Sequence, residues 1–205
     1  MLIKIDKFLD EKIDEKNQIN KELRKSIYKK KILKIIEAIY KSLKSGGKIL
    51  LCGNGGSAGD AQHLAAEFLI RLRPNVNRKG LPAISLATDT STITACANDF
   101  SYDEIFSRNL ETLGNKKDIL IAISTSGNSR NILKVLQTSK RKKIKSIAFL
   151  GNAGGKAKRY ADIDLIVPSK TTARIQESHI FLGHVIFEAV ENLIISKNYK
   201  KKLKI

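Results

Sequence analysis

The sequence predicts an α/β fold: a five-stranded parallel sheet flanked by helices, of the flavodoxin-like or Rossmann-like kind, with a helical extension at the N-terminus. Short apolar runs alternate with helical stretches from residue 48 onward, which is typical of a parallel sheet covered on both faces. The first 45 residues show helical periodicity instead. A length of 205 residues, 42% of them hydrophobic, suits a single domain with its own core.

The N-terminal segment 1–45 is expected to form two helices ahead of an α/β core that spans 46–195. Apolar residues recur at helical spacing through its second half, with lysines on the other faces, and the glycine pair 46–47 ends that helix. A weaker amphipathic pattern covers 2–20. Two such helices cannot bury their apolar stripes on each other alone. We therefore expect them to pack on the core or on a neighbouring subunit.

Five apolar runs are expected to form the strands, and each leads into a polar loop that contains glycine or serine. These strand-and-loop segments are 48–57, 81–90, 118–129, 144–155 and 163–169. The helical stretches between and after them are 58–72, 92–113, 129–142, 155–160 and a long apolar helix over 173–196. Parallel sheets bind ligands at the carboxyl ends of their strands, so the chemistry is expected in these loops.

The net charge of +18 is concentrated at the two ends of the chain. Residues 1–48 contain 14 Lys or Arg and 7 Asp or Glu, and residues 197–205 contain five lysines and no acidic residue. Such an excess can bind nucleic acid or an acidic membrane. The interleaved aromatics and ordered arginine clusters of a nucleic-acid site are absent, however. Solvated helix faces explain the charge better, so neither nucleic acid nor a membrane is an expected partner.

We expect a cytoplasmic, reduced protein. The longest apolar runs are too short to span a bilayer, and the first turns carry acidic residues with no small-residue cleavage site after them. The two cysteines cannot form a disulfide framework or a four-thiolate metal site.

The loop after the first strand has the composition of an anion-binding loop. It reads GNGGSA over 53–58, where glycines let a ligand approach the backbone and the next helix presents free N–H groups. Its likeness to a dinucleotide fingerprint is weak, because that motif needs an acidic residue about 20 positions further on, and Asp89 lies past that spacing.

The loop STSGNS over 124–129 is expected to hold a phosphate ester. It brings four hydroxyl groups to a helix N-terminus, where hydroxyls and backbone N–H groups can bind a dianion. One serine would be enough to cap the helix. A hydroxyl cradle and a glycine loop on adjacent strands describe a sugar phosphate better than a dinucleotide.

Two helices carry side chains suited to acid–base or metal chemistry. His63 and Glu67 are four residues apart and share one helix face. On the last helix Gln176 lies about 80° around the axis from His184, so both can lean toward one point, whereas His179 lies about 140° away. Taken alone, His63 with Glu67 reads as a surface pair and His184 as a core histidine. Together, beside a phosphate-binding core, they favour a site.

Four motifs occur in order along nearly the whole chain, over roughly residues 20–195: CGNGGSAGDAQHLAAEF, ANDFSYDEIFSR, ISTSGNS, and ARIQESH with GH further on. Together they resemble the bacterial phosphoheptose isomerases, a family of the sugar-isomerase (SIS) domain class that interconverts sedoheptulose 7-phosphate and glycero-manno-heptose 7-phosphate. ISTSGNS marks the SIS class alone. The combination of QHxxxE with IQExH…H narrows the resemblance to this family and its close relatives.

The resemblance implies an aldose–ketose isomerase of nucleotide-activated heptose biosynthesis. The resemblance leaves open whether the heptose is built into lipopolysaccharide or into capsule. It implies a homotetramer with active sites at subunit contacts, and one zinc ion per subunit. The implied zinc ligands are His63, Glu67, Gln176 and His184, and the acid–base pair is Glu67 with His184. The implied substrate-binding residues are Asn54, Gly55, Gly56, Ser57, Glu67, Asn98, Asp99, Ser124, Thr125, Ser126, Ser129 and Gln176. One departure is Ala173, where some members carry an aspartate.

Two other functions fit parts of the same pattern. A close relative of these isomerases is a non-catalytic protein that associates with the replication initiator. It shares the glycine loop and the ARIQE motif but lacks the glutamate and the final histidine that this chain keeps as Glu67 and His184. An SIS isomerase of another sugar phosphate, such as a hexose or amino-sugar ester, would have much the same loops.

Overall fold

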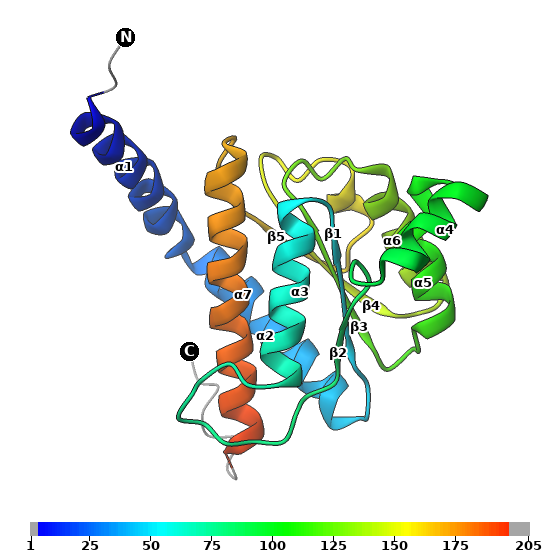
Figure 1. Ribbon diagram of the computed structural model, residues 1–205. Coiled ribbons are helices and arrows are strands. Elements are labelled where there is room, and N and C mark those ends of the chain that lie inside the picture. Colours follow the sequence, from blue (N-terminus) through cyan, green and yellow to red (C-terminus); the bar gives the residue numbers. More distant parts are fainter. Residues whose placement is uncertain (1–3, 197–205) are drawn as a thin grey trace.

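A computed structural model, which describes residues 4–196, confirms the five-stranded parallel sheet (Figure 1). The strands are β1 (Ile49–Gly53), β2 (Ala83–Ser85), β3 (Ile119–Ser124), β4 (Lys145–Leu150) and β5 (Ile163–Ile166). Their order is β2-β1-β3-β4-β5, and all neighbours pair in parallel. Because β1 lies beside β3, the glycine loop and the serine loop leave the sheet side by side, as expected. The five lysines of 197–205 lie outside the described residues.

Helices cover both faces of the sheet. They are α1 (Ile5–Leu23), α2 (Ser26–Lys44), α3 (Gly56–Leu69), α4 (Thr90–Asp99), α5 (Ile105–Leu113), α6 (Arg130–Arg141) and α7 (Thr172–Ile195), with short 3-10 turns η1 (Tyr102–Glu104) and η2 (Ala157–Arg159). Helices α2, α3 and α7 lie on one face, and α5 and α6 lie on the other (Figure 1). By length and composition α7 could cross a membrane, but half of its apolar window is buried inside the protein, as in a core helix.

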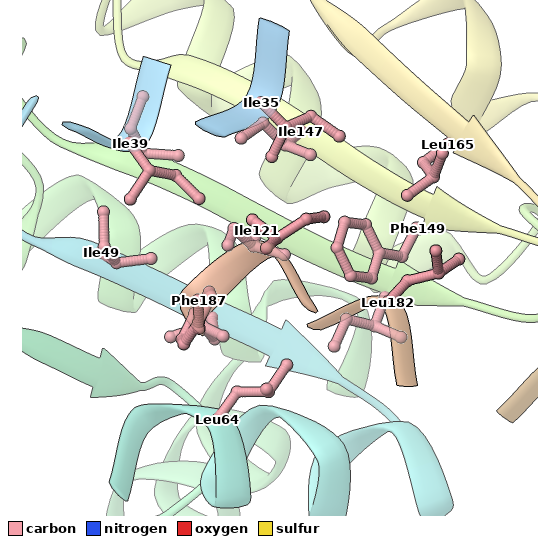
Figure 2. Close-up of a cluster of buried hydrophobic side chains, with 14 of the residues drawn as sticks. Ile35, Ile39, Ile49, Leu64, Ile121, Ile147, Phe149, Leu165, Leu182 and Phe187 are labelled. Carbon is pink, nitrogen blue, oxygen red and sulfur yellow. The ribbon is translucent and has the colours of Figure 1, made fainter. Parts of the chain in front are cut away.

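The alternation of side chains along the central strands divides the core in two. Every residue of β1 and β3 is buried, and successive side chains point to opposite faces. Ile121 belongs to the larger cluster, where it meets α2, α3 and α7, whereas Leu120 faces α5 and α6. Figure 2 shows the larger cluster, with Leu64 of α3 and Phe187 of α7 packed over the same strands. This packing places α3 and α7 next to each other.

The stretch 92–113, expected as one helix, is two helices with a break between them. The first, α4, ends at Asp99, and the chain is extended at Ser101 before η1 and α5 begin. At the end of α4, Asn98 donates a hydrogen bond to the side chain of Asp99 at 2.8 Å. The new direction lets Ile105 and Phe106 enter the core, each at most 2% exposed.

The two N-terminal helices differ in how far they are covered. On α2, Ile35 and Ile39 are fully buried against the core. Packing on the core was one of the two arrangements expected for the N-terminal helices. On α1, Lys16 donates to the hydroxyl of Ser178 on α7 at 2.7 Å, which ties its second half to the core. The apolar residues of its first half are exposed: Ile5, Phe8, Leu9 and Ile13.

Candidate active site

The two loops at the carboxyl edge of the sheet are locked together by a pair of asparagines. Asn54 of the glycine loop and Asn131 in the first turn of α6 exchange two side-chain hydrogen bonds, of 2.9 and 2.8 Å. The hydroxyl of Tyr102 donates to Asn54 Oδ1 at 3.1 Å. Sequence reasoning missed Asn131 and Tyr102, although Asn131 lies two residues after the serine motif and Tyr102 lies inside ANDFSYDE.

The glycine loop needs its glycines because it is both bent and crowded. Gly55 precedes α3 with φ +55° and ψ −123°, a conformation that side chains rarely adopt. A Cβ on Gly56 would lie 2.5 Å from Nε2 of Gln176, so this predicted site residue reaches the loop from α7. Ser57 is only 3% exposed and offers a ligand the least surface of the predicted residues in this loop.

The serine loop uses two of its four hydroxyls to hold its own shape. Ser124 Oγ accepts a hydrogen bond from the N–H of Gly127, and Ser126 Oγ accepts one from the N–H of Asn128, both at 3.1 Å. Ser129 is the N-cap residue of α6, yet its side chain makes no capping hydrogen bond. Helix capping therefore does not account for the Ser129 hydroxyl, which can bind an anion together with the free N–H groups of α6.

The turn after β4 supports the serine loop from behind. Gly127 and Gly155 both have positive φ, of 64° and 53°. A Cβ on Gly155 would lie 2.4 Å from the carbonyl oxygen of Ser126, and one on Gly127 would lie 2.1 Å from that of Gly154. The two backbones are therefore in contact, and the shape of the serine loop depends on glycines in a second segment.

Helices α3 and α7 bring together the imidazoles from the two ends of the chain. Nε2 of His63 lies 2.8 Å from Nε2 of His184, and Oε1 of Glu67 lies 3.6 Å from the same nitrogen of His63. Partial burial lowers the pKa of His184, and His63 lowers it further, while the Glu67 charge opposes both. Oε2 of Glu67 is buried with no hydrogen-bond partner in the described chain. A carboxylate with an unpartnered oxygen thus lies beside the imidazole pair.

Asp60 joins this group from one turn earlier on α3 and was not predicted. Its Oδ2 is buried without a partner in residues 4–196. Burial raises the pKa of the Asp60 carboxyl to about 6, although the neighbouring His63 lowers it. Its position three residues before His63, on the same helix face, was the signal in the sequence.

The predicted zinc ligands fit a metal by donor type. Two imidazole nitrogens and a carboxylate with an unpartnered oxygen are ligands that zinc prefers, and Gln176 would add its amide oxygen. Within residues 4–196, no three His, Cys, Asp or Glu side chains already form a metal-holding group. Gln176 contacts Gly56. Zinc at these four residues stays a prediction.

His179, Asn98 and Asp99 make their hydrogen bonds away from the imidazole pair. His179 is fully buried, its Nε2 lies 3.0 Å from the carbonyl oxygen of Leu150, and burial lowers its pKa to about 4. Its hydrogen bond is to the main chain of β4 and not to the imidazole pair, which agrees with its position on the helix. Asn98 and Asp99 are exposed at the end of α4, and Tyr102 is the residue of that motif that contacts the glycine loop.

Comparison with known proteins gives a consistent set of relatives. The SIS domain family model matches residues 13–151. The phosphoheptose isomerase of Chlorobaculum parvum is 54% identical over 157 residues, which cover 76% of this chain and 75% of that protein. The phosphoheptose isomerase of Helicobacter pylori strain P12 is 51% identical over 163 residues, or 80% of this chain and 84% of that one.

Solved structures agree with these relatives. The phosphoheptose isomerase of Francisella tularensis superposes with a TM-score of 0.87 at 34% identity, covering 93% of this chain and 100% of that one. The enzyme of the same name from Neisseria gonorrhoeae gives 0.84 at 36% identity, covering 92% and 99%. The similarity therefore extends over the sheet, the loops at its carboxyl edge and both helices that carry the imidazoles.

Proposed function

The chain belongs to the phosphoheptose isomerase family of SIS-domain proteins, and we propose that it converts sedoheptulose 7-phosphate to D-glycero-D-manno-heptose 7-phosphate in heptose biosynthesis. The observation that carries this proposal is the meeting of His63 and His184 at 2.8 Å with Glu67 beside them. A non-catalytic relative has no need of that arrangement.

The reaction moves a proton between C1 and C2 of the sugar and shifts the carbonyl group. Glu67 takes the proton from C1 through its carboxylate, while His184 gives a proton to the carbonyl oxygen on C2. An enediol results. His184 then recovers a proton from the hydroxyl on C1, and Glu67 returns its proton to C2, which leaves an aldehyde. Each group ends in its starting protonation state, so the two act as an acid–base pair.

The loops divide the binding of the substrate between them. The phosphate is held by the hydroxyls of the serine loop and the N-terminus of α6, where the helix dipole favours an anion. The residues proposed for this contact are Ser124, Thr125, Ser126 and Ser129. The sugar lies along Asn54 and the glycines, with Asn98 and Asp99 as further hydroxyl ligands. The asparagine pair fixes the distance between the two loops.

Zinc is part of the proposal, with His63, Glu67, Gln176 and His184 as its ligands. When bound, the metal would polarise the substrate carbonyl. We expect dialysis against a chelator to lower turnover at least about tenfold and added zinc to restore it. Elemental analysis should find about one zinc per wild-type chain and less in His63→Ala. Full turnover in protein shown to be free of metal would contradict this part of the proposal.

We also propose a homotetramer in the cytoplasm. The first half of α1 exposes an apolar stripe, and Phe181 on α7 is 50% exposed, as expected of surfaces that pack against further copies of the chain. Both cysteines are unpaired and buried, which suits a reducing compartment.

The decisive experiment is an assay of the purified chain on sedoheptulose 7-phosphate, coupled to detection of the aldose product. Hexose phosphates and amino-sugar phosphates are assayed in parallel. We expect the heptose phosphate to give the highest kcat/KM. A higher value for another sugar phosphate would assign the chain to a different SIS isomerase. Absence of turnover, together with capture of the replication initiator, would favour the binding protein.

The support of the serine loop by the turn after β4 gives a separate prediction. In Gly155→Ala the new Cβ would collide with the Ser126 carbonyl, so the loop must shift. We expect KM for the sugar phosphate to rise about tenfold, equivalent to ~1.4 kcal/mol of binding. Gly46→Ala is the control, because Gly46 also has positive φ but has nothing near a Cβ. An unchanged KM in folded Gly155→Ala would show that the turn does not shape the site.

A further inference from the structure

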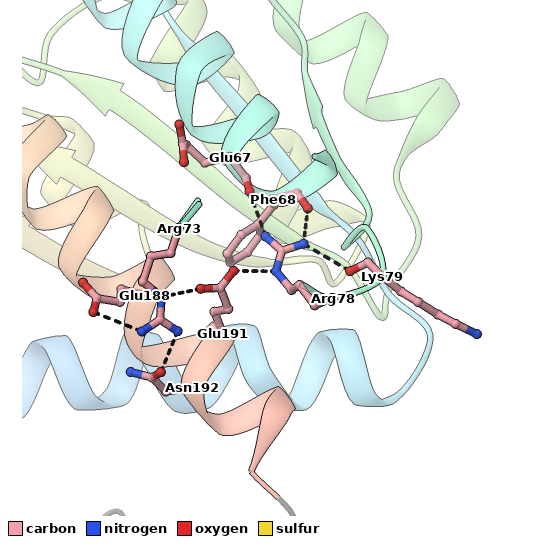
Figure 3. A network of polar contacts seen from close by, with 8 residues as sticks. All are labelled: Glu67, Phe68, Arg73, Arg78, Lys79, Glu188, Glu191 and Asn192. Atoms are coloured by element: carbon pink, nitrogen blue, oxygen red, sulfur yellow. Dashed lines mark hydrogen bonds and ion pairs between the residues drawn. The ribbon is translucent and has the colours of Figure 1, made fainter. Parts of the chain in front are cut away.

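A buried carboxylate joins the end of α3 to α7 through two arginines (Figure 3). Glu191 on α7 is fully buried, and it accepts hydrogen bonds from Nε of Arg73 at 2.7 Å and from Nε of Arg78 at 2.6 Å. A buried charge is tolerated only when it is paired and hydrogen-bonded. The loop 70–82 between α3 and β2 is thereby fixed against α7.

The two arginines differ in what else they bind. The Arg73 side chain makes its other hydrogen bonds to α7, with Glu188 and Asn192. Arg78 instead reaches back to the main chain of α3: Nη2 donates to the carbonyl of Glu67 at 2.8 Å, and Nη1 donates to that of Phe68 at 2.9 Å.

These carbonyls belong to the last turn of α3, where helix carbonyls lack partners within the helix and a cation is favourable. The Arg78 side chain is only 5% exposed, so water does not substitute for it easily. In Figure 3 the carbonyl of Glu67 faces Arg78, while its carboxylate points away from the arginines. Arg78 therefore holds the backbone from which the proposed catalytic carboxylate extends.

Glu191 is seven residues after His184, or about two turns of α7, so both lie on the helix face that meets α3. We propose that Arg78, held by Glu191, is a positioning residue for the isomerase reaction. It fixes the Glu67 backbone relative to α7 and so sets the carboxylate against the His184 imidazole. This inference rests on the proposed function of the site.

The expected effect is on turnover and not on substrate affinity. A displacement of about 1 Å in a catalytic group can lower the rate roughly 100-fold. In Arg78→Met we therefore expect kcat to fall about 10- to 100-fold. KM should stay within about twofold, because the proposed phosphate and sugar contacts lie on the loops after β3 and β1, which Arg78 does not touch. Arg78→Lys keeps the charge but cannot fork to Glu191 and two carbonyls, so its kcat should be intermediate.

Arg73→Met is the matched control. It removes a guanidinium from the same buried carboxylate, but it leaves the bonds of Arg78 to α3 in place. We expect its melting temperature to fall as well, because the buried Glu191 loses a partner, and its kcat to stay within about threefold of wild type. Equal losses of kcat in the two variants, or a KM that rises in step with the loss, would overturn the positioning role.

Amide hydrogen exchange in the peptide covering 64–72 gives a readout that needs no turnover. Exchange there should be faster in Arg78→Met than in Arg73→Met. If Arg78→Met does not fold, Arg78→Lys is compared with wild type instead, and exchange should be faster in Arg78→Lys. Equal exchange would overturn the anchoring of α3. If the wild-type chain shows no turnover, the proposed function fails, while the exchange comparison still decides whether Arg78 anchors Glu67.

Discussion

Glu67→Gln and His184→Gln are each expected to lower kcat on sedoheptulose 7-phosphate at least about 100-fold, the usual scale for an acid–base group. Glutamine keeps the size and much of the polarity of either side chain but can neither take up nor release a proton at neutral pH. The two residues lie on different helices that meet at the imidazole pair, so each substitution removes one of two groups that the proton transfer needs.

Glu188→Gln is the control for both substitutions. Glu188 also lies on α7, one turn after His184, but its side chain is 50% exposed and contacts Arg73 only at 3.4 Å. Its kcat should stay close to wild type. The double variant of Glu67 and His184 should be little slower than either single variant, because groups that act as one unit do not contribute additively. Near-normal turnover in either single variant of a folded protein would contradict the assignment.

Much of the fold could be predicted because the strands are short, apolar and bounded by polar loops. The adjacency of β1 and β3 was also predicted, because the glycine loop and the serine loop were expected to bind the same sugar phosphate. The break at Phe100 could not be predicted from periodicity, because apolar residues continue at helical spacing on both sides of it. The change of direction between α4 and α5 depends on how Ile105 and Phe106 pack in the core. That packing involves residues distant in the sequence, so local periodicity does not predict it.

The site residues that were predicted are those whose own chemistry marks them. His63, Glu67 and His184 stand out because imidazoles are scarce in this chain and the spacing of the first two suits one ligand. Asn131 and Arg78 have no such mark. Their roles arise from contacts with Asn54 and with the carbonyl of Glu67, which lie 77 and 11 residues away in the sequence.

The convergence of the site depends on the packing of α3 against α7, and Phe187→Ala tests that dependence. Phe187 stacks on Phe68 with ring centroids 3.7 Å apart, and both rings are fully buried. Close contact continues at Gly183, where a Cβ would lie 2.7 Å from Leu64. Truncating Phe187 should lower the free energy of unfolding by about 3–5 kcal/mol, since it removes a large buried ring and leaves a cavity.

The cavity left by Phe187→Ala lies between the two helices that carry the catalytic groups, so kcat of the folded fraction should fall as well. Phe106→Ala is the comparison, because Phe106 is equally buried but belongs to the cluster on the other face of the sheet. Denaturant unfolding at one fixed protein concentration, followed by kinetics in its absence, measures both quantities. A similar stability loss in the two variants, with kcat reduced only in Phe187→Ala, is the expected result. Equal kcat in both would mean that the imidazole pair does not depend on the α3–α7 contact.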